Sequence, residues 1–358
     1  MHLAMRRVTT AILLVGLALP CWCEDQASGR RVMDSPEDNP ALAAAQDLCA
    51  QHVPSLKALH EWQGDYGLGL EIVTAHYRIF TTFLEFEFLK RLPHFMESAH
   101  SAYNGLAAET VAPRAQSEVY LFADRRQWEV FTHAFAGDQA EVLCKIQQGA
   151  YCHKGACVAY NIGTDRTFAA LAHEGWHQFM TRHFAYRLPS WLDEGLAMRF
   201  ESFTWDKGEC RFQGVENVYR VDGLRFQLTQ GHVLSLRQLL ASSPGEMMTQ
   251  DNSHSVIGFY SQAYALTQFL TEGQRGHYRK RFARLLGDGL QAHWPLDAAS
   301  SNVAADRNKP RTLDWNRKVG VDLFTHYIDA DLPRIEAQYL AFFREMVQAT
   351  EIGSGRLQ

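Results

Sequence analysis

Apolar and polar positions follow different periods in the two halves of the chain. In the first half they predict strands over 71–80 and 117–122, helices over 83–106 and 125–135, and a hairpin within 149–162. In the second half they predict helices over 233–240, 259–270, 278–286 and 332–346, with loops over 203–221 and 287–311. An α+β fold is therefore expected, with an α/β lobe over 68–201 that contains a mixed sheet, and a mainly helical lobe over 202–358.

One further predicted helix carries two histidines. Apolar residues recur every three or four positions between Phe168 and Phe179, and Thr164 and Asp165 offer capping oxygens at the start. Within this helix the sequence His173-Glu174-Gly175-Trp176-His177 places the two imidazoles four residues apart. They would lie one turn apart on the same face, where they can share a metal ion.

A carboxylate follows 17 residues after His177, in a segment that reads Leu-Pro-Ser-Trp-Leu-Asp-Glu-Gly-Leu-Ala over 188–197. This segment predicts a loop and a second helix, with Ser190 as the N-cap and Asp193 as its capping-box partner. Helical phase and the capping role of Asp193 then favour Glu194 over Asp193 as the residue that faces the histidines. Two histidines, one carboxylate and an open fourth position form the ligand set of a catalytic zinc site, so one Zn²⁺ per chain is expected.

These two segments together, His-Glu-x-x-His and Pro-x-Trp-Leu-x-Glu-Gly-Leu-Ala, resemble the gluzincin group of zinc metallopeptidases, the thermolysin-like branch of peptidase clan MA. The resemblance covers residues 150–201 and, more loosely, the helical stretch to about 290. It implies that Glu194 is the third zinc ligand and that a helical lobe follows it. It also implies a cleft edge formed by the strand before the zinc helix, for which Val158–Ile162 is the candidate; an ordinary sheet strand is the alternative.

The expected chemistry follows from the ligand charges. Zinc held by two neutral imidazoles and one carboxylate lowers the pKa of a bound water, and Glu174 would act as the general base. The resemblance implies an oxyanion donor from the later lobe. Tyr260 is preferred to Tyr264 for this role, with core packing as the alternative for Tyr260.

The chain departs from the thermolysin-like pattern at one position. These enzymes often carry an acidic residue one turn after the glutamate ligand, and here Met198 stands there. Because ligand histidines need a carboxylate or carbonyl to orient them, that partner must come from elsewhere.

Residues 1–23 resemble a secretory signal peptide, because Arg6 and Arg7 precede an apolar run, Val8 to Leu19, that is too short to span a bilayer. Lipidation at Cys21 is the alternative. Removal of both arginines with this peptide would change the formal charge from −5 to −7, and such mild acidity gives no reason to expect nucleic-acid binding. Residues 24–67 are expected to form a flexible arm. The protein is therefore expected to be secreted or periplasmic, with no stable membrane span.

Five cysteines lie beyond residue 23, which fits an oxidising compartment and leaves one without a disulfide partner. Cys152 and Cys157 flank the short loop 153–156 of the predicted hairpin, so they would lie opposite each other and within disulfide range. A metal site that includes Cys152, His153 and Cys157 is the alternative, at a spacing unusual for zinc.

Together these features predict a secreted zinc-dependent metallopeptidase that acts on a peptide or protein substrate. Two other classes remain open: a peptidase-like protein that binds zinc without turnover, and a non-catalytic domain in which the motif is accidental. The intact Glu174 favours the enzyme. Nothing in the sequence defines an oligomeric state.

Overall fold

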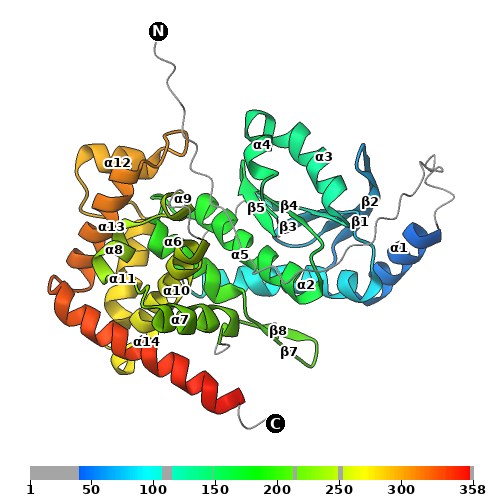
Figure 1. The fold of residues 1–358 in the computed structure, drawn as a ribbon. Helices are drawn as coiled ribbons and strands as arrows, with labels where there is room; N and C mark the ends of the chain where they lie inside the picture. The colour runs from blue at the N-terminus through cyan, green and yellow to red at the C-terminus, as the bar shows by residue number, and fades with distance from the viewer. Residues whose placement is uncertain (1–39, 107–114, 148, 213–215, 249–252, 355–358) are drawn as a thin grey trace. The chain divides into compact units, whose positions relative to one another are not determined.

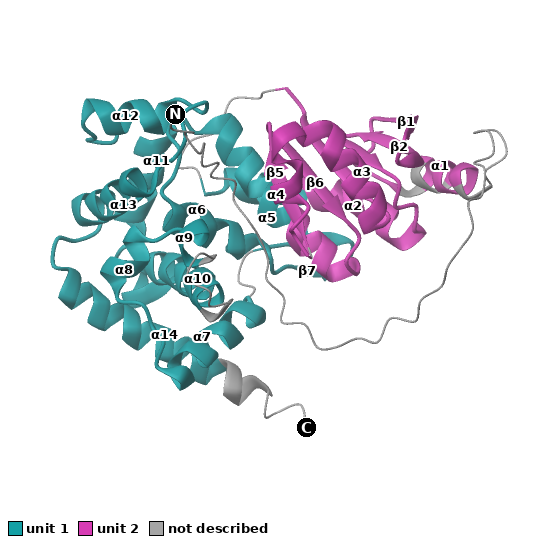
Figure 2. Cartoon of the chain, turned by 45° about the horizontal axis from the view of Figure 1, so that its top comes forward, with its two compact units in different colours: residues 1–12, 98–114, 172–358 teal, residues 13–97, 115–171 magenta. Residues whose placement is uncertain are grey.

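The computed structural model describes residues 40–106, 115–147, 149–212, 216–248 and 253–354 (Figure 1). The chain forms two compact units, shown in separate colours in Figure 2. Described residues within 40–97 and 115–171 form what we call the sheet unit, and those within 98–106 and 172–354 form the helical unit. The boundary between the two units falls inside the predicted zinc helix, between Leu171 and Ala172.

The sheet unit is built on a six-stranded mixed sheet with the strand order β1-β2-β3-β4-β6-β5. The strands are β1 (Ala58–Gly64), β2 (Gly67–Val73), β3 (Tyr77–Thr81), β4 (Ser117–Phe122), β5 (Ala150–His153) and β6 (Ala156–Tyr160). Strands β3, β4 and β6 pair in parallel, and the other pairs are antiparallel. Its helices are α1 (Pro40–His52), α2 (Phe86–Asn104), α3 (Arg125–Ala136), α4 (Ala140–Leu143) and the first turns of α5 (Thr164–His183), with a 3₁₀ turn η2 (Gly137–Gln139). Helices α2 and α5 continue into the helical unit.

The sheet confirms the predicted α+β class and corrects two details. The strand predicted over 71–80 is two strands, because the chain turns between Val73 and Tyr77, where the Tyr77 N–H donates to the Thr74 hydroxyl at 3.1 Å. The flexible arm predicted over 24–67 contains α1 and β1, while residues 24–39 lie outside the described part of the chain. Strand β1 alternates only weakly between half-buried and exposed side chains, so its sequence carries little strand signal.

The prediction that Val158–Ile162 forms a sheet edge is wrong. Strand β6 pairs with β4 on one side and with β5 on the other, so it is interior. The edge strands are β1 and β5. Strand β5 precedes β6 in a tight hairpin, and the hairpin covers the side of β6 that the prediction left open.

The same hairpin places Cys152 directly opposite Cys157, as predicted. No disulfide joins any cysteines in the described part of the chain. The bridge itself therefore stays a prediction for oxidising conditions.

The helical unit includes the second half of α5. Its elements are α6 (Ser190–Ala197), the 3₁₀ turn η3 (Met198–Phe200), β7 (Thr204–Asp206), β8 (Glu209–Arg211), α7 (Val218–Gln230), α8 (Leu236–Ala241), α9 (Pro244–Met248), α10 (Ser253–Gly276), α11 (Arg279–Leu290), α12 (Ala298–Ala305), α13 (Leu313–Tyr327) and α14 (Leu332–Ser354). Helix α6 packs closely on α10, since a Cβ at Gly195 would lie 2.6 Å from the Ala263 carbonyl oxygen. The Thr267 hydroxyl donates to the Gly195 carbonyl across this contact at 2.9 Å.

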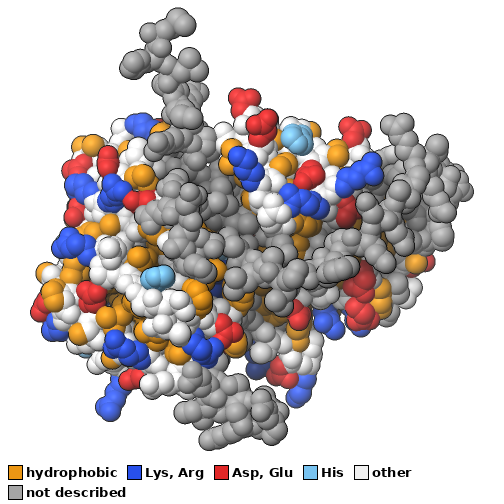
Figure 3. Space-filling view, viewed as in Figure 1, with side chains coloured by type: hydrophobic (Ala, Val, Ile, Leu, Met, Phe, Trp, Pro, Cys, Tyr) orange, Lys and Arg blue, Asp and Glu red, His pale blue; other side chains and the backbone are white. Residues whose placement is uncertain are grey.

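The two predicted loops contain regular structure. Residues 203–221 include the β7-β8 hairpin and the start of α7, and 287–311 include α12, whose alanine- and serine-rich sequence has little apolar periodicity. None of the described helices combines the length and the apolar character required to cross a membrane. Acidic and basic side chains are interspersed on the face drawn in Figure 3.

Candidate metal centre

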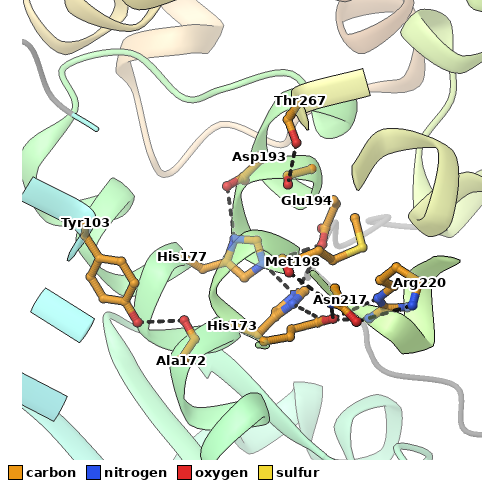
Figure 4. A network of polar contacts seen from close by, with 12 residues as sticks. Tyr103, Ala172, His173, His177, Asp193, Glu194, Met198, Asn217, Arg220 and Thr267 are labelled. Atoms are coloured by element: carbon orange, nitrogen blue, oxygen red, sulfur yellow. Dashed lines mark hydrogen bonds and ion pairs between the residues drawn. The ribbon is translucent and has the colours of Figure 1, made fainter. Parts of the chain in front are cut away.

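Three predicted ligands meet in the helical unit. His173 and His177 lie one turn apart on α5, and Glu194 lies on the short helix α6 (Figure 4). One potential ligand atom from each lies within 4.8 Å of the others, and the three residues are only 1–3% exposed. The structure therefore brings together the three residues that sequence spacing selected.

The three ligand atoms form a nearly equilateral triangle. The Nε2 atoms of His173 and His177 are 3.2 Å apart, and they lie 3.4 and 3.5 Å from Glu194 Oε2. A tetrahedral zinc ion with bonds of about 2.0–2.2 Å separates its ligand atoms by roughly 3.3–3.6 Å. The triangle thus has the dimensions of one face of a zinc coordination tetrahedron.

Each histidine is oriented by a buried carboxylate through its other ring nitrogen. His173 Nδ1 lies 2.8 Å from Glu201 Oε1, and His177 Nδ1 lies 3.0 Å from Asp193 Oδ1. Because an ionised carboxylate only accepts hydrogen bonds, both Nδ1 atoms carry a proton. In a neutral ring Nε2 is then unprotonated and offers its lone pair to a metal ion. Two such lone pairs and the Glu194 carboxylate converge on one point, which calls for a cation there.

The formal charge of the buried site is also consistent with a bound cation. Neither Glu194 oxygen has a hydrogen-bond partner among the described residues, although both are buried. Four buried acids and the two arginines ion-paired with them surround the neutral imidazoles: Glu174, Asp193, Glu194, Glu201, Arg220 and Arg311. With both imidazoles neutral and all four acids ionised, the formal charge is −2, which either a divalent cation or two protons on the imidazoles can balance.

The pKa values of the ligands reflect this crowding. Burial alone would lower the pKa of His173, but the adjacent carboxylates of Glu194 and Glu201 raise it to about 9. Burial likewise opposes protonation of His177, whose pKa the charges of Asp193 and Glu194 raise well above its ordinary value. Burial would raise the pKa of Glu194, but the two imidazoles lower it. Without a metal the site therefore attracts protons, with which a metal ion must compete.

Glu174 lies beside the ligands on α5 and is 3% exposed. Its Oε2 atom has no hydrogen-bond partner within the described structure. Burial raises the pKa of Glu174 to about 7, and the neighbouring imidazoles oppose this rise. A carboxyl group with this pKa can both accept and release a proton near neutral pH.

Tyr260 and Tyr264 are both buried on α10, but their surroundings differ. The Tyr264 hydroxyl accepts the Asn217 N–H and a side-chain N–H of Gln268, each at 3.0 Å. Burial raises the pKa of Tyr260 well above its ordinary value, and the charges of Glu194 and Glu174 raise it further. Tyr260 thus lies within electrostatic reach of the metal site, whereas Tyr264 holds the start of α7.

The residues that orient the histidines were not predicted. Pro189, and not Ser190, is the N-cap of α6, with no side-chain cap. The carboxylate of Asp193 instead accepts from the His177 ring and, at 3.2 Å, from the Trp176 indole N–H. Met198 stands where related enzymes carry an acid, and Glu201 takes the role of that acid by orienting His173. Glu201 lies seven residues, about two helical turns, after Glu194, and this spacing could have identified it from the sequence.

Glu201 is itself held in place from α7. Arg220 donates to both its oxygens, at 2.8 Å from Nε and 2.6 Å from Nη2, and Asn217 Nδ2 donates at 2.8 Å (Figure 4). Burial opposes ionisation of Glu201, but the charge of Arg220 and the hydrogen bonds from His173 and Arg220 lower its pKa to about 2. Glu201 therefore stays ionised over the pH range in which the histidines titrate.

Two histidines and a glutamate thus define a buried site that can hold a metal ion. Residues 167–289 match the model of a protein family described as "Protein of unknown function (DUF1570)". The matched stretch contains the three candidate ligands, Glu174, and the residues that orient the two histidines. A comparison with curated proteins gave no match.

Proposed function

We propose that this protein is a zinc-dependent metallopeptidase of the gluzincin type, with zinc held by His173, His177 and Glu194. The observation that carries the proposal is the triangle of three ligand atoms, with an otherwise unpartnered Glu194 carboxylate and the buried carboxyl group of Glu174 one residue from the first ligand. Orienting carboxylates on both histidines are typical of zinc sites in which the ligand geometry is fixed in advance.

When bound, zinc would lower the pKa of a water molecule and polarise the carbonyl group of the scissile peptide bond. Glu174 accepts the proton of the attacking water and passes it to the leaving amine nitrogen. The Tyr260 hydroxyl donates a hydrogen bond to the negative charge that develops on the carbonyl oxygen. Glu201 and Asp193 keep the two imidazole rings in the tautomer that leaves Nε2 available.

The test separates metal binding from hydrolysis. Glu174→Gln should keep one zinc per chain but lower the cleavage of labelled casein and of a quenched peptide library by about 10²- to 10⁴-fold, because the general base is lost. Glu194→Ala should lose both zinc and activity, because one ligand is removed. Zinc is measured by elemental analysis of protein purified without chelator.

Glu246→Gln is a suitable control, since Glu246 pairs with Arg317 on the surface of the helical unit. Full zinc affinity in Glu194→Ala would contradict the ligand assignment. Equal cleavage by the native protein and by Glu174→Gln would contradict the role of Glu174.

A second function, zinc binding without turnover, is favoured by one observation: each ligand and Glu174 are at most 3% exposed. In that case the native protein would bind zinc stoichiometrically, and neither it nor Glu174→Gln would cleave any peptide in the library.

A further inference from the structure

Arg220 contacts two different parts of the candidate centre at once. Its side chain is 3% exposed and belongs to the first turn of α7. Two of its N–H groups donate to the two oxygens of Glu201, which in turn accepts from the His173 ring. A chain of charge-assisted hydrogen bonds therefore leads from Arg220 to a proposed metal ligand.

The same guanidinium group also lies over two aromatic rings. Its central carbon lies 5.4 Å from the ring centre of Tyr260 and 5.3 Å from that of Tyr219. Tyr219 is 43% exposed, so its ring forms the outer contact and the buried Tyr260 the inner one. Both distances are within the range of a cation–π interaction.

We propose that Arg220 is a positioning residue that fixes the Glu201–His173 pair with its N–H groups and the ring of Tyr260 with its face. The part that concerns Tyr260 rests on the proposed function, whereas the part that concerns His173 requires only that the site binds metal. Arg220 thereby couples metal retention to the placement of the oxyanion donor.

The chemistry of the side chain explains why an arginine serves both purposes. A guanidinium group is planar, so it offers hydrogen bonds along its edge and a flat cationic surface to a ring. A lysine ammonium at this position could neutralise Glu201, but it could not bind both carboxylate oxygens in a plane and stack on Tyr260. Arg220→Lys therefore separates charge neutralisation from geometry.

The experiment measures zinc affinity by chelator competition in the full chain, for Arg220→Gln and Arg220→Lys. We expect Arg220→Gln to weaken zinc binding by about 10- to 100-fold, as for other residues that orient zinc ligands. Arg220→Lys should recover part of this loss. The visible absorption of the Co²⁺-loaded protein should change in Arg220→Gln, because His173 is no longer held in one orientation.

Arg199→Gln is the matched control, because Arg199 is half-buried in the helical unit and bonds to Thr271 and not to the centre. It should leave zinc affinity and the Co²⁺ spectrum unchanged. Native zinc affinity in a folded Arg220→Gln protein would overturn the metal part of the inference. If Arg220→Gln fails to fold, Arg220→Lys decides the same question, since unchanged affinity and spectrum in that variant overturn it equally.

The Tyr260 part is tested by turnover at saturating zinc in Arg220→Lys, Tyr260→Phe and the double variant. If Arg220 acts through the Tyr260 hydroxyl, the lysine substitution should lower kcat severalfold in the native background and much less in the Tyr260→Phe background. Additive losses would overturn the coupling. Failure of the proposed function looks different, because the native protein would then bind zinc and cleave no peptide.

Discussion

Two tyrosines one helical turn apart on α10 show how the surroundings of a residue decide its role. The Tyr264 hydroxyl accepts the N–H of Asn217, the N-cap of α7, whereas Tyr260 lies near Arg220 and the charges of Glu194 and Glu174. We expect Tyr260→Phe to lower kcat by roughly ten- to a thousandfold with little change in zinc affinity, because a hydrogen bond to the developing oxyanion is lost.

Tyr264→Phe is the matched comparison. It should cost about 1–3 kcal/mol of unfolding free energy, because the buried Asn217 N–H loses its acceptor, and it should affect kcat less than Tyr260→Phe does. Steady-state kinetics and urea denaturation of both variants make the measurement. A native kcat in Tyr260→Phe would return that residue to a packing role.

Individual site residues could be predicted from the sequence where their spacing along the chain indicates a shared role. The spacing of His173 and His177 and the context of Glu194 selected three residues that the structure brings together. Asp193 was misjudged, because a capping box and a histidine partner require the same kind of side chain, and only the tertiary structure decides between them. Arg220 could not be selected, because its partner Glu201 lies 19 residues away on another element.

At the scale of elements, Gly175 looks out of place inside the zinc helix, since glycine destabilises a helix interior by about 1 kcal/mol relative to alanine. The structure gives the reason. A Cβ at Gly175 would lie 2.6 Å from the Tyr103 hydroxyl oxygen, and this hydroxyl donates to the Ala172 carbonyl of the same helix at 2.6 Å. Helix α2 thus contacts α5 directly in the turn that carries His173.

This contact predicts a dependence between two substitutions. Gly175→Ala should destabilise the native protein by about 1–3 kcal/mol, because the added methyl group displaces Tyr103. In a Tyr103→Phe background the cost should be smaller or reversed, since the next ring atom is 3.4 Å away and alanine favours the helix. Chemical denaturation of the four proteins measures the coupling; strictly additive free energies would show that the contact does not limit this position.

Elements with strong periodicity were predicted almost to the residue, as β4 and α3 show. Others were missed where their packing faces differ from a simple apolar stripe. Helix α13 buries Asn316, whose side chain accepts the Ser190 N–H at 2.7 Å and donates to the Ser242 carbonyl at 2.8 Å. A buried asparagine that joins the start of α6 to the end of α8 cannot be told from a surface residue in the sequence.

At the scale of the whole molecule, all proposed ligands belong to the helical unit, although α5 begins in the sheet unit. Zinc should therefore stabilise the helical unit more than the sheet unit. At a free zinc concentration 1,000 times its Kd, the unfolding free energy of the helical unit should rise by about 4 kcal/mol. Hydrogen exchange with zinc and after chelation should show slower exchange in α6 and the start of α7, and little change in β2 and β3. Glu194→Ala should abolish the difference, and equal slowing in the strands would show that the two units unfold together.

Glu201 also has a consequence for how such chains are recognised among other sequences. A search motif that requires an acidic residue four positions after the glutamate ligand does not match this chain, which has Met198 there. Such a search would classify the chain as a relative that has lost part of its site. Helix α6 gives way to the tighter turn η3 directly after Ala197, and the orienting acid follows that turn. A motif that also accepts a glutamate seven residues beyond the ligand would retain this chain and would separate sequences with a complete ligand environment from those that have lost it.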